Sequence, residues 1–408
     1  MSDEIPAPLL ELDDAHRQMA EIVHPVSGVV TVNLADALGH VMAETVIAPY
    51  ALPPFDNTGV DGFAFHHSDC ENGRLKLVGQ SLAGEPLMAT LPPGCAVHIA
   101  TGAVLPSGAD TVAMQEYARL EGNDVFIDPI PPQGANIRRA GFDIRQGETA
   151  ITTAHRLRPQ DIALLGALGL TSVKVVRPLR IGVLATGTEL QEVGARLENG
   201  QIIDTNSLML KQLLFGWPID VTMLGILPDD RAATDAMLLK AAADCDLLIS
   251  TGGVSVGRRD YIRDAVQALG KVHFWKLALR PGRPVMFGEI GGCLILGLPG
   301  NPVSVLVTFY LVGMPLLQAL WGMTPSLPPA FKVPLAETVR KEKHLRSFPR
   351  ARLEFRHSTW QAVPFHDQSS NLFTSLVRSD GMLDLPTGLT EITAGTQVSF
   401  RPFSSGHF

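Results

Sequence analysis

Short apolar runs alternate with amphipathic segments between residues 179 and 326. The apolar runs include IGVLAT, VTMLGIL, DLLIST and CLILGL, and the segments between them, such as SLMLKQLLF and RAATDAMLLKAAA, have helical spacing. Apolar strands joined by helices form parallel sheets that are covered on both faces, because each crossover helix packs on the sheet. The pattern therefore predicts a doubly wound parallel-sheet α/β domain over residues 179–326.

The regions that flank this domain have a different pattern. Residues 327–408 contain short strand-like pieces, among them KVPLA, ARLEF and TQVSFRP, and residues 46–144 are rich in turn signals such as LAGEP and LPPGC. We expect a small C-terminal β domain and an inserted N-terminal β domain. Residues 1–45 with 145–178, which include the helically spaced LLELDDAHRQMAEIV and LADALGHVMAETV, are expected to form an N-terminal helical or linker domain. The fold class is thus α/β and β, multidomain.

Charge and hydropathy exclude several classes of protein. The 408 residues carry a formal net charge of -8, which argues against nucleic acid or an anionic membrane as a general partner. The start MSDEIPAPLLELDD has no basic segment followed by an apolar one, so we expect a cytoplasmic protein. The apolar stretch 303–321 is interrupted by Pro315 and Gln318 and is predicted to be a buried core helix rather than a membrane span. The four cysteines lie far apart, which disfavours a disulfide framework or a zinc site.

Ligands of open parallel sheets bind outside the carboxyl ends of the strands, so the loops that follow the strands are the candidates for chemistry. In STGGVSVGRRDY, glycines and hydroxyls could cradle an anion, although a simple tight turn is the alternative. In LPGNPVS, Asn301 and Pro302 have the pattern of a helix start, which either caps the helix or presents free amides to an anion.

Charged residues in these loops suggest a phosphorylated ligand with a metal. Four acids, Glu189, Asp229, Asp230 and Asp260, follow three different strands, and their convergence would suit Mg²⁺ held by carboxylates and phosphate oxygens; solvated surface acids are the alternative. In HFWKLALRPGRP, a period of two predicts that Lys276, Ala278 and Arg280 share one strand face, with Arg283 just beyond.

An ordered set of motifs spans nearly the whole chain. The set is DNTGVDGFA, TGA, NIRRAGFD, TGTEL, DTNSLML, STGGVSVGRRDY, FWKLALRPGRP and LPGNPVS. In this order they resemble the molybdopterin molybdenumtransferase family, which includes the C-terminal domain of gephyrin. The resemblance implies a four-domain homodimer that inserts molybdenum from molybdate into adenylylated molybdopterin, with Mg²⁺-dependent release of AMP. It also implies a molybdopterin adenylyltransferase and molybdoenzyme maturation proteins as partners.

The resemblance also implies which residues carry the chemistry. Carried over position by position, the implied catalytic residues are Asp61, Thr101, Glu189, Asp260 and Lys276. The implied metal ligands are Glu189, Asp229 and Asp230. The implied substrate-binding residues are Arg138, Gly252, Gly253, Ser255, Gly257, Arg280, Arg283, Asn301 and Ser370.

Some positions depart from the family pattern. Thr188 and Phe142 stand where acids are usual, Arg258 stands where an acid is common, and RPGRP replaces a sequence with two lysines. Arginine keeps the charge but presents a planar fork in place of a compact ammonium. A divergent paralogue that binds a molybdopterin nucleotide, as a scaffold or with weak or different catalysis, is therefore the alternative to an insertase.

Overall fold

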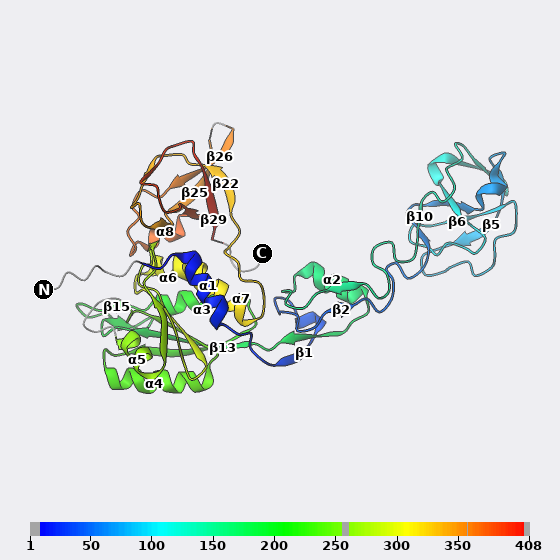
Figure 1. Cartoon of the computed structure of the whole chain (residues 1–408). Helices are drawn as coiled ribbons and strands as arrows, with labels where there is room; N and C mark the ends of the chain where they lie inside the picture. The colour runs from blue at the N-terminus through cyan, green and yellow to red at the C-terminus, as the bar shows by residue number, and fades with distance from the viewer. Residues whose placement is uncertain (1–8, 255–260, 357, 404–408) are drawn as a thin grey trace. The chain divides into compact units, whose positions relative to one another are not determined.

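The computed structural model describes residues 9–254, 261–356 and 358–403 (Figure 1). These residues form two compact units. The first unit comprises residues up to 30, residues 39–41 and the chain from 175 onward; the second comprises residues 31–38 and 42–174.

A six-stranded sheet forms the centre of the first unit. Its order is β16 (Ile219–Leu227), β13 (Leu179–Thr186), β17 (Leu247–Thr251), β21 (Cys293–Leu298), β20 (Met286–Ile290) and β18 (Lys271–Trp275). The first four strands run parallel, as the alternating pattern predicts, but β20 and β18 pair antiparallel. The sheet is therefore mixed rather than wholly parallel. The reason is a tight hairpin in which Gly291 and Gly292, both at positive φ, join β20 to β21.

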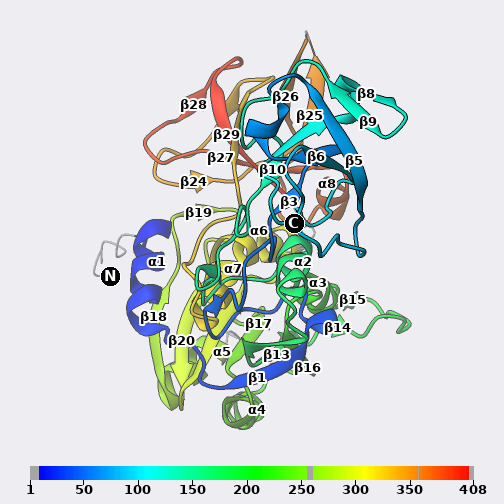
Figure 2. The same cartoon turned by 90° about the vertical axis from the view of Figure 1, so that its right-hand side faces the viewer.

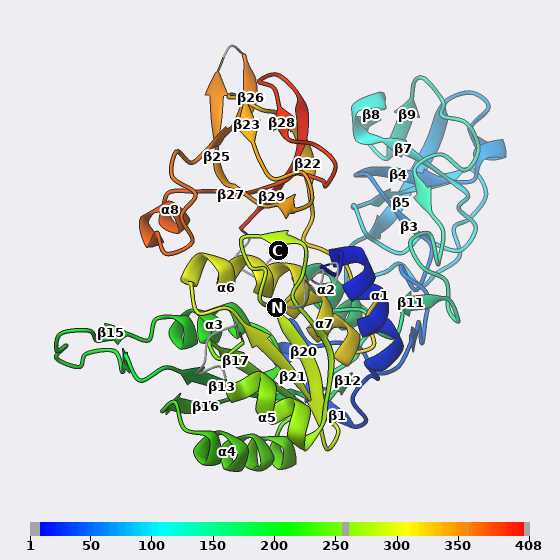
Figure 3. The ribbon, with the colours of Figure 1, turned by 60° about the vertical axis from the view of Figure 1, so that its left-hand side comes forward.

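Helices cover both faces of this sheet (Figure 3). On one face α4 (Arg231–Asp244) and α5 (Tyr261–Leu269) share a core with Leu184, Leu248 and Ile295 of the strands. On the other face lie α1 (Leu12–Ile22), α3 (Asn206–Leu214), α6 (Pro302–Thr308) and α7 (Met314–Leu320). Both cores are apolar, and this two-sided covering confirms the predicted doubly wound arrangement.

The apolar stretch 303–321 is a core helix, as expected. Among the described residues one helix, Pro302–Leu320, is long and apolar enough to cross a membrane, and 78% of its apolar window is buried inside the protein. A π-helical turn, Phe309–Gly313, lies between α6 and α7. Because Pro315 has no N–H, it cannot bond to the carbonyl four residues earlier, that of Leu311. A side chain from α1 also reaches this carbonyl: His16 Nε2 lies 2.7 Å from Leu311 O.

A five-stranded antiparallel sheet forms the C-terminal part of the first unit, as predicted. Its order is β22 (Phe331–Pro334), β29 (Gln397–Pro402), β27 (Gly381–Asp384), β25 (Arg350–Arg356) and β26 (Thr359–Pro364). A short parallel pair links it to the α/β region: β19 (Leu279–Arg280) pairs with β24 (Arg346–Ser347), as Figure 2 shows. This pair fixes the RPGRP loop next to residues 341–347.

The second unit contains the inserted β domain that the turn signals predict. Its six strands have the order β7 (Thr111–Met114), β4 (Gly62–Phe65), β6 (Cys95–Ile99), β5 (Arg74–Ser81), β9 (Asp124–Ile127) and β8 (Ala118–Glu121). The helix expected for LADALGHVMAETV is wrong, because only the single turn η1 (Leu34–Asp36) forms there. Gly39, at φ 79°, ends the helical geometry after that turn. By contrast, RPQDIALLGALG forms α2 (Pro159–Ala167).

Candidate functional site

A cavity of about 850 Å³ lies at the carboxyl ends of the parallel strands in the first unit. Loops after β13, β16, β17 and β21 line it, together with the start of α3 and part of the segment that leads to α8 (Phe373–Val377). The polar and glycine residues that line it include Thr186, Glu189, Asp204, Asn206, Asp229, Thr251, Gly252, Gly253, Asn301 and Asn371. The fold therefore brings together loops that are more than a hundred residues apart in sequence.

The glycine loop after β17 requires glycine at two positions. Gly252 and Gly253 have φ of 81° and 69°, and a Cβ at either would lie 2.8 Å from a neighbouring atom, Thr186 O or Ile262 Cγ1. The N–H of Gly252 donates to Leu298 O at 3.1 Å, so this amide bonds within the sheet edge. Ser255, Gly257, Arg258 and Asp260 lie outside the described residues.

Two of the predicted acids lie at the cavity. Glu189 is exposed, and both its carboxylate oxygens lie 2.7 Å from where a Cβ of Gly187 would be. Asp229 also lines the cavity, and Thr188 Oγ1 donates to its Oδ2 at 3.4 Å. Asp230 instead caps α4, because its Oδ1 accepts the N–H of Ala233 at 2.8 Å. Of the adjacent pair, Asp229 is thus the residue that lines the cavity.

The cavity has the oxygen donors that a hard cation requires. The carboxylates of Glu189 and Asp229 both line this cavity. Mg²⁺ is commonly held by one or two carboxylates plus substrate phosphates. Within residues 9–254, 261–356 and 358–403 no group of three or more His, Cys, Asp or Glu side chains is close enough to hold a metal alone. The described residues therefore fit Mg²⁺ only as a cation shared with a phosphorylated ligand.

The expectation that Lys276, Ala278 and Arg280 share one strand face is wrong. Strand β18 ends at Trp275, and Lys276 has φ 69°, so the alternation stops there. Ala278 is buried, and Lys276 is not among the residues that line the cavity. The Lys276 ammonium lies over the Trp275 ring instead, with Nζ 3.9 Å from the ring centroid.

Trp275 links this cationic group to the glycine loop. Its Nε1 donates to Val254 O at 2.7 Å, and Val254 lines the cavity. The Arg263 guanidinium also lies over the ring, 4.3 Å from the centroid. Sequence reasoning missed Trp275, since its apolar ring gave no polar signal.

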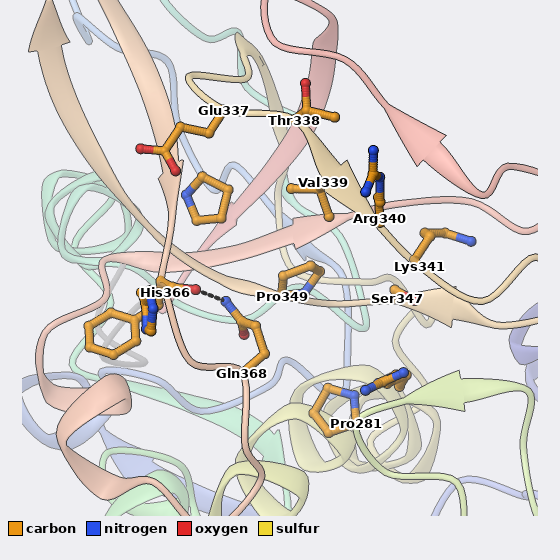
Figure 4. Close-up of a pocket in the computed structure, with 13 residues that line it drawn as sticks. Pro281, Glu337, Thr338, Val339, Arg340, Lys341, Ser347, Pro349, His366 and Gln368 are labelled. Atoms are coloured by element: carbon orange, nitrogen blue, oxygen red, sulfur yellow. Dashed lines mark hydrogen bonds between the residues drawn. The ribbon is translucent and has the colours of Figure 1, made fainter.

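The RPGRP loop lines a second, smaller cavity of about 340 Å³ (Figure 4). The guanidinium of Arg280 donates from Nη1 to Glu342 Oε1 at 2.7 Å, and Arg283 Nη2 lies 3.7 Å from Glu342 Oε2. Gly282 is required here because a Cβ would overlap the Thr308 methyl group. Neither arginine is among the residues that line the larger cavity.

Asn301 and Ser370 contact one another. Asn301 is the N-cap residue of α6 with Pro302 at the first helical position, as predicted, yet its side chain makes no cap hydrogen bond. Its Nδ2 donates instead to Ser370 Oγ at 2.8 Å. The start of α6 is therefore joined to the segment that leads to α8.

Sequence reasoning also missed Arg350, at the start of β25. Its side chain is fully buried, and Nη2 donates to the carbonyl oxygens of Asp367 and Ser369, both at 3.1 Å. Burial lowers the pKa of Arg350 to about 10. The sequence alone does not reveal this contact, because it depends on how β25 packs against residues 367–369.

The remaining predicted residues lie in the second unit. Asp61 Oδ1 accepts both the N–H and the hydroxyl of Thr101, at 2.7 and 3.0 Å. These hydrogen bonds from Thr101 lower the pKa of Asp61. Arg138, on β10 (Ile137–Arg138), lies beside Gly59, where a Cβ would be 3.1 Å from its Nε. The exposed Phe142 takes no part in this contact.

Comparison with known proteins covers nearly the whole chain. Successive family models match the MoeA N-terminal region (domain I and II) over residues 10–169, a probable molybdopterin binding domain over 182–319 and the MoeA C-terminal region (domain IV) over 332–403. The molybdopterin molybdenumtransferase of Haemophilus influenzae is 37% identical over 402 residues, 97% of this chain and 99% of the relative. That of a Nostoc species is 34% identical and covers 90% of this chain and 87% of the relative.

The fold agrees with these matches. The crystal structure of the molybdopterin biosynthesis moeA protein from Pyrococcus horikoshii OT3 has a TM-score of 0.84 and 27% identity, with 97% of this chain and 100% of that chain covered. Another crystal structure, of a molybdopterin biosynthesis moea protein from Pyrococcus horikosii, has a TM-score of 0.78 and 29% identity, with 97% of this chain and 99% of that chain covered. The chain therefore belongs to the molybdopterin molybdenumtransferase family, whose MoeA regions match it from residue 10 to residue 403.

Proposed function

We propose that this protein inserts molybdenum from molybdate into adenylylated molybdopterin and releases AMP. Family membership over nearly the full length supports the reaction class. The observation that carries the proposal is the cavity of about 850 Å³ at the sheet edge, where two carboxylates, a glycine loop and the start of α6 face one space. Because Glu189 and Asp229 are both retained there, we favour an insertase over a scaffold that only binds the nucleotide.

The described residues divide the tasks of binding and positioning. Gly252 and Gly253 line the cavity, and their positive φ of 81° and 69° gives the loop the backbone turn that a ligand would contact. Asn301 and Pro302 at the start of α6 line the cavity, but Pro302 has no N–H and the Val303 N–H donates to Ser370 O at 3.2 Å, so this segment shapes the wall of the cavity. The arginines of RPGRP offer planar donors that suit an oxyanion.

Mg²⁺ is proposed as the cation of this site, with Glu189 and Asp229 as its protein ligands. When bound, it would neutralise charge on the phosphate oxygens as AMP leaves. We propose that the exposed Asp61–Thr101 pair and Arg138 of the second unit also bind or position substrate. As the family resemblance implies, Asp260 and Lys276 are proposed as catalytic residues, and Ser255 and Gly257 as substrate-binding residues. The Lys276 ammonium lies over the ring of Trp275.

Further proposals concern the protein's setting. We propose a cytoplasmic homodimer that receives adenylylated molybdopterin from a molybdopterin adenylyltransferase and delivers the product to molybdoenzyme maturation proteins. Nucleic acid and membranes are not proposed as partners. Sedimentation of the purified protein would test the dimer, because a monomer of 408 residues and a dimer differ twofold in mass.

Molybdate-dependent release of AMP from adenylylated molybdopterin tests the function. An insertase releases AMP only when molybdate and Mg²⁺ are both present, and EDTA stops the release. Glu189→Gln should lower the rate by roughly 10² while the protein stays folded, as is typical when a preorganised charged contact is removed. A protein that binds the nucleotide without releasing AMP would support the scaffold alternative instead.

A further inference from the structure

Three basic side chains surround one carboxylate beside the RPGRP loop. Arg280 Nη1 donates to Glu342 Oε1 at 2.7 Å. Arg283 Nη2 lies 3.7 Å and His344 Nε2 3.5 Å from the other oxygen, Oε2. Among the residues that the structure describes, Glu342 is the one acid within ion-pair distance of either arginine.

The chain holds this carboxylate in place through its backbone. Lys341 Nζ donates to the carbonyl oxygens of Glu342, Leu345 and Leu389, at 3.0, 2.8 and 3.1 Å. The Glu342 carbonyl also accepts the N–H of Leu345, which closes a turn. Figure 4 shows Lys341 and Pro281 on the wall of the smaller cavity next to this turn. The ladder of β19 with β24 fixes the distance between this turn and Arg280.

We propose that Glu342 is a tethered carboxylate that occupies the two arginines of RPGRP and competes with the oxyanion substrate for them. The inference deepens the proposed function, because it takes molybdate as that oxyanion. Arg280 and Arg283 are the donors best placed to bind an oxyanion at this loop, and Glu342 already satisfies them in the free protein. Substrate binding at the loop then requires that Glu342 moves away.

The exposure of the pair makes such a displacement feasible. The side chains of Arg280, Arg283 and Glu342 are 61%, 47% and 41% exposed. Ion pairs this exposed are weak, and their loss changes an equilibrium by about tenfold at most. Glu342 would therefore weaken anion binding without preventing it.

Because Glu342 has to leave the two arginines before an oxyanion binds there, it weakens the binding of every such anion by the same factor. Glu342 therefore sets the concentration of oxyanion at which the loop is occupied.

Calorimetric titration of the full-length protein with sodium molybdate tests this inference. Glu342→Gln should bind molybdate about three- to tenfold more tightly than the wild type. The matched control is Glu391→Gln, which removes the same charge from another exposed pair, Arg340–Glu391 at 2.7 Å, away from RPGRP. Its molybdate affinity should equal that of the wild type.

Two further variants keep the test decisive. Glu342→Asp shortens the side chain by one methylene and should give a smaller gain in molybdate affinity. This variant replaces Glu342→Gln in the test if the Gln variant fails to fold. In an Arg280→Gln background the effect of Glu342→Gln should shrink, because one of the two contested donors is gone. Equal affinity of the wild type and the Glu342 variants, or absence of binding by all of them, overturns the inference. AMP release by the wild type judges the proposed function separately, since it measures turnover, whereas the titration measures only the binding of molybdate.

Discussion

Asp61 and Thr101 are forty residues apart in sequence, yet one carboxylate oxygen of Asp61 accepts two hydrogen bonds from Thr101. The backbone N–H contributes one and the hydroxyl the other, at 2.7 and 3.0 Å. Both residues are exposed, so packing in the protein core does not account for the position of their side chains. Exposed polar residues held this firmly are more typical of a binding site than of a stabilising contact.

Asp61→Asn should lower AMP release by roughly 10², because the carboxylate charge is lost while the fold is kept. Thr101→Val removes the hydroxyl donor but leaves the backbone N–H. Because those donors lower the pKa of Asp61, its pKa should rise in the Thr101 variant, and any loss of activity that comes from protonating Asp61 should begin at a higher pH. The pH profile of kcat/KM measures this shift. If the wild type and Thr101→Val have the same acid limb, Asp61 takes no part in the reaction.

Trp275→Phe should loosen the glycine loop, since phenylalanine keeps an aromatic ring for Lys276 and Arg263 but cannot donate to Val254 O. We expect a loss of about 1 kcal/mol in the free energy of unfolding, the usual contribution of one hydrogen bond. We also expect a higher KM for adenylylated molybdopterin.

Trp360→Phe is the control for this variant. Trp360 is an exposed tryptophan on β26 that packs against Phe355, 5.6 Å between ring centroids, and it does not line the larger cavity. Urea unfolding and KM should both match the wild type in this control. If the two Trp variants behave alike, Trp275 has no special role at the loop.

The sequence predicted the parts of the fold that rest on periodicity. The runs IGVLAT, DLLIST and CLILGL became neighbouring parallel strands because each is apolar on both faces. The hairpin of β20 with β21 escaped prediction, because the run before Gly291 and Gly292 could equally end a parallel crossover. The position of Lys276 was predicted wrongly because its backbone, at positive φ, bonds to Val285 across the RPGRP loop and to Leu10 near the N-terminus, and local periodicity encodes neither contact.

The candidate site was predictable to a similar extent. Glu189 and Asp229 follow from the rule that ligands bind at the carboxyl ends of parallel strands. Glu342 and Arg350 come from the C-terminal β region, whose strand pairing depends on tertiary contacts that local patterns do not encode.

Gly253→Ala should destabilise the glycine loop by about 2–4 kcal/mol. A positive φ costs an alanine about 1–2 kcal/mol, and a Cβ 2.8 Å from Ile262 Cγ1 adds the cost of overpacking. Gly84→Ala is the matched control, because Gly84 also has a positive φ, 84°, but nothing lies within 4 Å of its would-be Cβ. Thermal unfolding should separate the two variants; equal shifts would mean that only the backbone conformation matters.

The contact of His16 with Leu311 O should make stability depend on pH. Burial lowers the pKa of His16 below its usual 6.5, despite the opposing effects of the Leu311 carbonyl and of nearby Asp13; the positive charge of Arg346 lowers it further. The folded state therefore binds a proton less readily than the unfolded chain, so this contribution to stability is present above pH 6.5 and is lost as the pH falls from 6.5 through the lower pKa of the folded state. Below that pH the urea midpoint of the wild type should decrease.

Two substitutions separate charge from hydrogen bonding at this position. His16→Gln keeps a donor and cannot become charged, so the pH-dependent difference between it and the wild type should appear only at acid pH. His16→Leu should cost about 0.5–1.5 kcal/mol at all pH values, because it removes the hydrogen bond to Leu311 O. Urea unfolding of the three proteins between pH 5 and 8 measures both effects. If the difference between the wild type and His16→Gln is the same at both ends of this range, the titration of His16 does not affect folding, and the contact only holds α1 against the π-helical turn.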